Sequence, residues 1–100
     1  MPSPAEDGPL LELFDVLGQR WTLRVLWELR AGPLTYRDIA GRINGLSTSV
    51  LTERLRDLRA ADLVGHEHGG YRLTVRGSEL IRHVQSLRRW AEQSGFTSGR

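Results

Sequence analysis

The first half of the chain has the pattern of short helices, because apolar residues recur at spacings of three and four positions. Leu10, Leu13 and Leu17 predict a helix over residues 9–17, which opens at a proline and stops before a glycine. Residues 21–30 are apolar on nearly every side. A helix of that kind is covered by its neighbours, so this segment is predicted to be the central element of the core.

Two more helices begin at hydroxyl residues, which can accept hydrogen bonds from the free N–H groups of a helix start. Thr35 and Asp38 form a capping-box pattern for a third helix, which an Asn-Gly pair ends. Ser47 or Thr48 caps a fourth helix that ends near residue 61. Its apolar side consists of Leu51, Leu55 and Leu58. Hydroxyl and charged residues fill its other side, so this helix is predicted to have one anchored side and one free side.

A β-hairpin and a long helix complete the pattern. Residues 64–68 and 71–73 flank Gly69 and Gly70, and a tight hairpin turn needs residues that accept a positive φ. Thr74 can cap a final helix with one apolar stripe. The stripe consists of Leu80, Val84, Leu87 and Ala91, widened by Ile81 and Trp90.

This order of elements predicts the fold class. Two short helices joined by a glycine-containing turn and followed at once by a hairpin are typical of a winged helix-turn-helix. The chain is therefore expected to be mostly α with a small β-hairpin wing. Residues 10–93 form the predicted domain, while the proline-rich residues 1–9 and residues 94–100 are expected to be flexible tails.

Composition narrows the chemistry. Cysteine is absent, which removes disulfides, thiolate metal ligands and a thiol nucleophile. The N-terminus has no apolar signal segment and no run is long enough to span a membrane, so we expect a cytoplasmic protein with no membrane partner. All fourteen Lys and Arg positions are arginine, which suits phosphate and guanine. The net charge is only +2, so the positions of the arginines carry more information than their number.

Four blocks of the sequence, in order, resemble one family. The blocks "LGQRWTLRVLWEL", "GPLTYRDIA", "GLSTSVLTERLRDLRAADLV" and "YRLTVRGSEL" are similar to the HxlR-type branch of the MarR-like transcriptional regulators. The resemblance covers roughly residues 14–90. It implies a homodimeric repressor or activator that binds a pseudo-palindromic operator, with the terminal helices of both subunits forming the dimer interface. The wing is shorter than is usual in the family, and the N-terminal cysteine of its redox-sensing members is missing.

Hydroxyl and arginine side chains near the start of the fourth helix are the main candidates for DNA contact. Ser47 is assigned to capping, and Ser49 and Thr52 to DNA. Arg56 lies four residues beyond Thr52, where it can contact guanine or phosphate or instead pair with Glu53 on the surface. Arg37 is a candidate for phosphate or a solvated surface residue. The predicted DNA-binding residues are Arg37, Ser47, Thr48, Ser49, Thr52, Glu53, Arg56, His66, His68 and Arg72.

The wing histidines also allow a second interpretation, in which they bind a metal ion. His66 and His68 are two positions apart, so on one strand they would face the same side, as a pair of metal ligands does. No further histidine, cysteine or carboxylate cluster completes such a site in the sequence, so no metal is predicted and contact with phosphate or solvent is preferred.

The three tryptophans are assigned to the core or a dimer interface and not to a ligand pocket.

The terminal helices carry more apolar surface than a monomer of this size covers, which favours a dimer. The predicted interface residues are Leu10, Phe14, Val84, Leu87, Trp90 and Ala91.

A sequence-specific DNA-binding regulator is the leading function. The alternative is a winged helix that binds proteins and not DNA. An enzyme is not expected, because the sequence has no thiol, no phosphate-binding glycine loop and no convincing nucleophile–histidine–acid set, and no cofactor is predicted. An unidentified small-molecule effector stays open.

Overall fold

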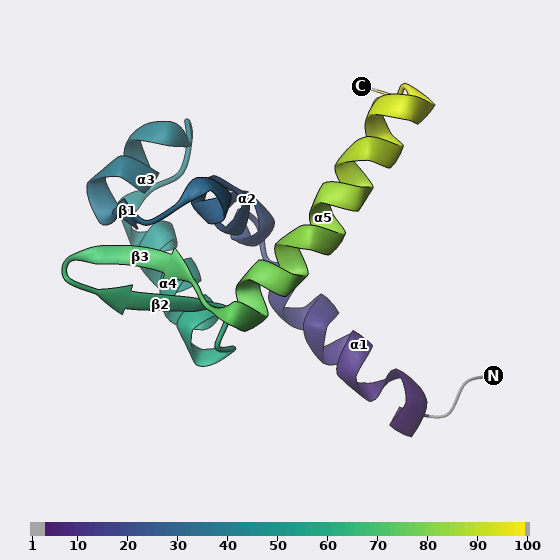
Figure 1. Cartoon of the computed structure of the whole chain (residues 1–100), viewed down its shortest axis with the longest axis horizontal. Coiled ribbons are helices and arrows are strands. Elements are labelled where there is room, and N and C mark those ends of the chain that lie inside the picture. Colours follow the sequence, from purple (N-terminus) through teal and green to yellow (C-terminus); the bar gives the residue numbers. More distant parts are fainter. Residues whose placement is uncertain (1–3, 100) are drawn as a thin grey trace.

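The computed structural model describes residues 4–99 and has five α-helices, one 3₁₀ helix and three strands within that range. In chain order these are α1 (Pro4–Leu17), α2 (Thr22–Glu28), η1 (Leu29–Ala31), β1 (Leu34–Thr35), α3 (Tyr36–Arg42), α4 (Thr48–Ala60), β2 (Val64–Glu67), β3 (Gly70–Leu73) and α5 (Val75–Ser94). In Figure 1, α2, α3, α4 and the small sheet form a body from which α1 and the second half of α5 project. Among the described residues, every helix is too short or too polar to span a lipid bilayer.

The first helix begins earlier than the sequence pattern predicts. It starts at Pro4 and includes Pro9, so residues 4–9 of the expected tail are helical, while residues 1–3 lie outside the described range. Proline is favoured at the first position of a helix because its missing N–H would have no helical partner there. Pro9 lacks the N–H for one internal hydrogen bond. The pattern placed the start at Pro9 because apolar residues recur only from Leu10 onward.

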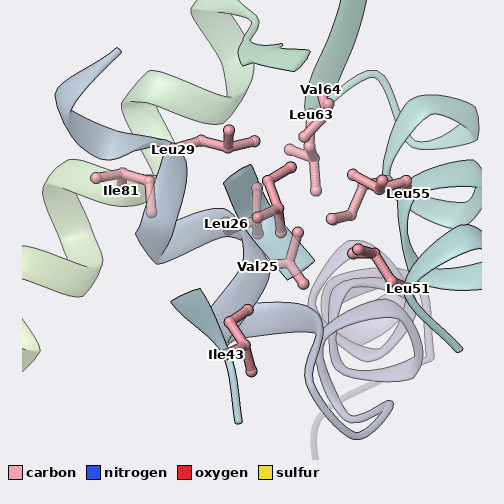
Figure 2. Packing of buried hydrophobic residues seen from close by; sticks show 11 residues of the cluster. Val25, Leu26, Leu29, Ile43, Leu51, Leu55, Leu63, Val64 and Ile81 are labelled. Atoms are coloured by element: carbon pink, nitrogen blue, oxygen red, sulfur yellow. The ribbon is translucent and has the colours of Figure 1, made fainter. Parts of the chain in front are cut away.

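The core forms around α2, as predicted. Val25, Leu26 and Leu29 are at most 1% exposed. Figure 2 shows them between Leu51 and Leu55 of α4 on one side and Ile81 of α5 on the other. The helix itself begins at Thr22, one residue later than predicted, because Trp21 has a φ of 79° and lies outside the helical region.

The predicted caps of the middle helices are present. The Thr35 hydroxyl accepts the Asp38 N–H at 3.1 Å and the Asp38 carboxylate accepts the Thr35 N–H at 3.3 Å, which is a complete capping box. Ser47 caps α4 by accepting the Val50 N–H at 3.2 Å. Between the two alternatives Ser47 and Thr48, the structure thus selects Ser47.

The hairpin is present, but its turn is shifted by one residue. Glu67 pairs with Gly70, so the two turn residues are His68 and Gly69, with φ of 52° and 76°. Two consecutive positive φ angles are typical of the type I′ turn, which matches the twist of the strands. The prediction of Gly69 and Gly70 was wrong because glycine was taken as the only signal for positive φ. The sheet also has a third strand that was not predicted: β1 pairs with β3, giving the order β1-β3-β2.

The last helix begins as predicted and ends in an ordered cap. Thr74 accepts the Gly77 N–H at 3.0 Å, and its hydroxyl donates to the Asp62 carbonyl at 2.7 Å. At the other end, Gly95 has a φ of 62° and Phe96 donates its N–H to the Ala91 carbonyl at 3.0 Å. This is a Schellman arrangement, in which an apolar residue after the glycine returns to the helix. Phe96 lies 5.9 Å from Trp90 between ring centroids, so the predicted C-terminal tail contributes a structured helix end.

Candidate nucleic-acid interface

Helix α4 has one side in the core and one side free. Leu51, Leu55 and Leu58 are at most 2% exposed. The residues on the opposite side are all exposed: Ser49, Thr52, Glu53 and Arg56. The two sets alternate at spacings of three and four, so the leucines fix the orientation of the helix and leave its polar side exposed.

The start of α4 presents hydroxyl groups. Ser47 and Thr48 are exposed, and the Ser47 oxygen that caps the helix also lies 3.3 Å from the Ser49 oxygen. A helix start carries free N–H groups and the positive end of the helix dipole, both of which favour a negatively charged ligand. This end of α4 therefore suits a phosphate oxygen or a base edge.

Thr52 is exposed but its hydroxyl is engaged within the protein. Its Oγ1 donates to the Thr48 carbonyl at 2.9 Å and lies 3.0 Å from the Tyr36 hydroxyl. Tyr36 donates to the same Thr48 carbonyl at 2.6 Å. These contacts join the first residue of α3 to the first turns of α4. Sequence reasoning did not assign Tyr36 to the site, since a tyrosine at a helix start gives no signal of its distant partner.

Two of the three arginines of α4, Arg54 and Arg56, have different surroundings. Arg54 donates to the Arg20 carbonyl at 2.9 Å and pairs with Asp57 at 3.2 Å, and only 14% of its side chain is exposed. Arg56 is exposed, and among residues 7–99, whose side chains the structure describes, it forms no ion pair with Glu53 or any other acid. Arg37 on α3 is likewise exposed and has no ion pair in that range. The surface ion pair between Arg56 and Glu53, one of the two interpretations of Arg56, is therefore not present.

The wing residues are partly engaged with each other. Arg72 forms an ion pair with Glu67 across the hairpin, which neutralises its charge locally. The His66 ring stacks on Tyr71, with centroids 4.0 Å apart and planes inclined by 2°. His68 lies in the turn, so it does not share a strand face with His66, and the expected same-side geometry of the two histidines was wrong. Within the described residues, no group of three or more His, Asp or Glu is placed to hold a metal.

The projecting helices expose apolar side chains. Leu10 is 48% exposed, Phe14 55%, Leu87 61% and Trp90 58%, while Val84 and Ala91 are half-buried. A groove of about 540 Å³ lies between α2 and α5. It is lined by Trp27, Arg30, Val84, Leu87, Arg88 and Ala91, which include three of the residues predicted for a dimer interface.

This geometry defines the class of protein. A short helix, a turn and a second helix whose outer side is free, with a hairpin beside them, form a winged helix-turn-helix, which binds duplex DNA through the second helix.

Comparison with known proteins identifies the family within that class. The sequence profile of the HxlR-like helix-turn-helix family matches residues 16–97. The chain is 30% identical over 87 residues to the HTH-type transcriptional regulator YodB of Bacillus subtilis, covering 80% of this chain and 78% of that protein. It is 30% identical over 95 residues to the HTH-type transcriptional regulator YtfH of Escherichia coli, covering 88% and 75%.

Comparison with solved structures gives the same type of protein. The structure of quinone-bound YodB from B. subtilis matches with a TM-score of 0.80 at 30% identity, over 86% of this chain and 98% of that one. A transcriptional regulator of the MarR family from Enterococcus faecalis V583 matches with a TM-score of 0.80 at 25% identity, over 89% and 87%. The chain belongs to the HxlR-like helix-turn-helix family and is a DNA-binding transcriptional regulator, which confirms the resemblance seen in its sequence.

Proposed function

We propose that this regulator is a repressor that binds a pseudo-palindromic operator as a homodimer and acts by occupancy, without catalysis. The observation that carries the proposal is the free polar side of α4, with the unpaired Arg56 opposite a fully buried row of leucines. A helix anchored in this way can enter the major groove as a rigid rod. A repressor that acts by occupancy needs no more than such a bound dimer.

The contacts divide by chemistry. Ser49, Thr52 and Arg56 face the major groove, where an arginine can bind the two acceptors of guanine. Ser47, Thr48 and Glu53 border this surface, and Arg37 on α3 contacts the DNA backbone. In the wing, His68 lies at the tip, while His66 and Arg72 are already held by Tyr71 and Glu67. The wing therefore contributes less than α4.

Charge and apolar surface together support the dimer. Residues 4–17 of α1 contain four acidic and no basic residues, whereas residues 75–94 of α5 contain four arginines and two glutamates. Both helices expose large apolar residues, among them Phe14 and Leu87. We place α1 of one protomer against the groove between α2 and α5 of its partner, because this pairs acidic with basic and apolar with apolar surfaces.

A small-molecule effector would act without a thiol. YodB has been solved with bound quinone, but this chain contains no cysteine, so covalent capture by a thiolate is not available to it. A cavity of about 420 Å³ lies between α1 and the body. Its lining residues are Pro9, Glu12, Leu13, Val16, Ala61, Leu63, Arg76 and Leu80. A ligand there would alter the angle of α1 and so the spacing of the two α4 helices.

A protein-binding winged helix is the competing function. The Glu67–Arg72 ion pair favours it, because a wing that neutralises its own arginine attracts phosphate weakly. The two functions differ in their response to salt. Phosphate contacts release counterions, so DNA binding weakens steeply as salt rises, whereas association through apolar surface does not.

The deciding experiment is footprinting of the purified protein on the DNA that flanks its own coding region, followed by titration of the protected duplex at several salt concentrations. We expect a protected segment with two related half-sites about 34 Å apart and a steep loss of affinity with salt. Binding equally strong to unrelated duplexes, or no protection at all, would contradict a sequence-specific repressor.

A further inference from the structure

Three oxygen atoms meet where the first residue of α3 contacts the first two turns of α4. The Tyr36 hydroxyl lies 2.6 Å from the Thr48 carbonyl oxygen and 3.0 Å from Thr52 Oγ1, and Thr52 Oγ1 lies 2.9 Å from the same carbonyl. All three distances are within hydrogen-bonding range. Two of these atoms belong to hydroxyls with one proton each, and the third is a carbonyl that can only accept.

The number of available protons determines the direction in which the Thr52 hydroxyl points its proton. The shortest contact gives the Tyr36 proton to the Thr48 carbonyl. If the Thr52 proton pointed outward, Thr52 would face the carbonyl at 2.9 Å with lone pair against lone pair. The Thr52 proton is therefore directed inward, to the Thr48 carbonyl or to the Tyr36 oxygen. In the alternative in which Tyr36 donates to Thr52, the Thr52 proton still goes to the carbonyl.

The exposed part of Thr52 is consequently a lone pair and a methyl group. A phosphate oxygen offers only lone pairs, so it cannot bond to this hydroxyl. In the major groove, the groups that donate hydrogen bonds are the N6 amino group of adenine and the N4 amino group of cytosine. Guanine presents two acceptors there, and thymine presents one acceptor beside its methyl group; each of these acceptor atoms would meet the Thr52 lone pair unfavourably.

We propose that the Thr48 carbonyl and the Tyr36 hydroxyl together hold Thr52 as a hydrogen-bond acceptor on the DNA-facing side of α4, so that Thr52 selects an amino-bearing base, adenine or cytosine, at one position of each half-site. This rests on the proposed function, because it assumes that α4 enters the major groove. Tyr36 is half-buried and acts through Thr52 as a positioning residue, with no DNA contact of its own.

The test selects binding sites from a duplex library with randomised half-sites. The wild-type protein is compared with Thr52→Val, which keeps the shape and removes the oxygen, and with Thr52→Ser, which keeps the oxygen. Tyr36→Phe removes the positioning hydroxyl. Tyr71→Phe is the matched control, since it removes a tyrosine hydroxyl from strand β3 of the wing and leaves α3 and α4 unchanged. Melting temperatures confirm that each variant is folded.

We expect the wild-type protein to restrict one position per half-site to adenine or cytosine on one strand. Thr52→Val should lose that restriction alone and bind the selected site roughly three- to ten-fold more weakly, the range for one hydrogen bond. Thr52→Ser should keep the restriction, Tyr36→Phe should broaden it at the same position, and Tyr71→Phe should leave that position unchanged.

Two results would overturn the proposal while leaving the regulator intact. One is a Thr52→Val protein that selects the same base at every position as the wild type. The other is a wild-type protein that accepts A·T and T·A, or G·C and C·G, equally well at every position of the half-site, because the two orientations of a base pair place its amino group on opposite strands. If the wild-type protein selects no common sequence, the proposed function fails and this inference fails with it.

Discussion

Arg54 and Arg56 are only two positions apart on α4, yet Arg54 is held against the protein and Arg56 is exposed on the proposed DNA-facing side. Two residues correspond to about 200° of rotation on an α-helix, so the two side chains leave α4 in nearly opposite directions. Arg54 turns back to the Arg20 carbonyl and Asp57, whereas Arg56 points away from the body. An arginine without an acidic partner keeps its full charge and all its N–H donors for a ligand.

Replacing Arg56 should weaken operator binding without affecting the fold. Arg56→Ala is expected to cost about 1–3 kcal/mol of binding free energy if the arginine contacts a base. The measurement is a titration of the footprinted duplex. Arg82→Ala is the control, because Arg82 is an exposed arginine on α5. Equal losses for both variants would mean that only general charge is involved, and an unchanged affinity for Arg56→Ala would remove this residue from the interface.

Thr22 offers a test of stability at a single atom. It is 0% exposed, and its hydroxyl has no hydrogen-bond partner among the described residues. A buried hydroxyl without a partner costs about 1–3 kcal/mol, so Thr22→Val should raise the free energy of unfolding by about 1 kcal/mol. Urea denaturation measures this. Thr35→Val is the opposite case, since it removes the cap of α3 and should lower stability by about 1 kcal/mol. A loss of stability in Thr22→Val would reveal a partner for that hydroxyl.

At the scale of elements, the junction of the sheet and α5 depends on one glycine. Gly77 is buried in the first turn of α5, and a Cβ atom there would lie 2.0 Å from the Leu63 carbonyl oxygen. The Leu63 oxygen belongs to the backbone and the added Cβ would be fixed to the Gly77 backbone, so neither atom can move aside as the end of a long side chain does. The close approach also lets Thr74 bond to both Asp62 and the start of α5, which fixes the angle at which α5 leaves the body.

Two glycine substitutions should therefore have opposite effects. Gly77→Ala is expected to destabilise the protein by more than about 3 kcal/mol, in the range of severe overpacking. Gly41→Ala in α3 meets no atom within 4 Å, so it should stabilise by about 0.5–1 kcal/mol through helix propensity. Thermal unfolding of the two variants checks both signs. A Gly77→Ala protein that melts like the wild type would show that α5 can shift away from Leu63.

The same elements show what the sequence determines locally. The caps at Thr35, Ser47 and Thr74 were predictable because each acts within three residues of itself. The free side of α4 was predictable for the same reason, since periodicity fixes which residues share a side. The strand β1 was not, because two residues carry no alternation and their partner lies in β3.

Pairings between distant residues escaped prediction for a similar reason. Tyr36 contacts Thr52 and Arg54 contacts Arg20 across a sequence separation of 16 and 34 residues, and nothing local marks such partners. The turn at His68 was missed because a positive φ is uncommon outside glycine, although histidine is among the residues that adopt it more often, and here the register of Glu67 with Gly70 imposes it.

At the scale of the whole molecule, the shape is more extended than a compact domain. The radius of gyration is 14.7 Å, against about 13 Å for a compact chain of 100 residues. The excess comes from α1 and the outer half of α5, which leave the body in different directions in Figure 1. These are also the segments that expose Phe14, Leu87 and Trp90. Projecting helices that expose large apolar side chains in this way are stabilised when a second copy covers those side chains.

A charged residue in place of one of these exposed apolar residues should therefore dissociate the dimer. The two α4 helices would then no longer be held in one molecule. Leu87→Glu and Phe14→Glu are expected to lower the mass in analytical ultracentrifugation from twice 11.3 kDa to 11.3 kDa. Val75→Glu is the matched control, because Val75 is 79% exposed but lies outside the predicted interface, so this variant should remain dimeric.

The DNA affinity should fall far more than the loss of one apolar contact explains. In a dimer, binding of one half-site brings the second α4 to its own half-site at a high effective concentration, and a monomer loses that gain, worth about 10²–10⁴-fold in affinity. A monomeric Leu87→Glu protein that protects the full operator with wild-type affinity would show that one α4 suffices, and the homodimer would then have no part in DNA binding.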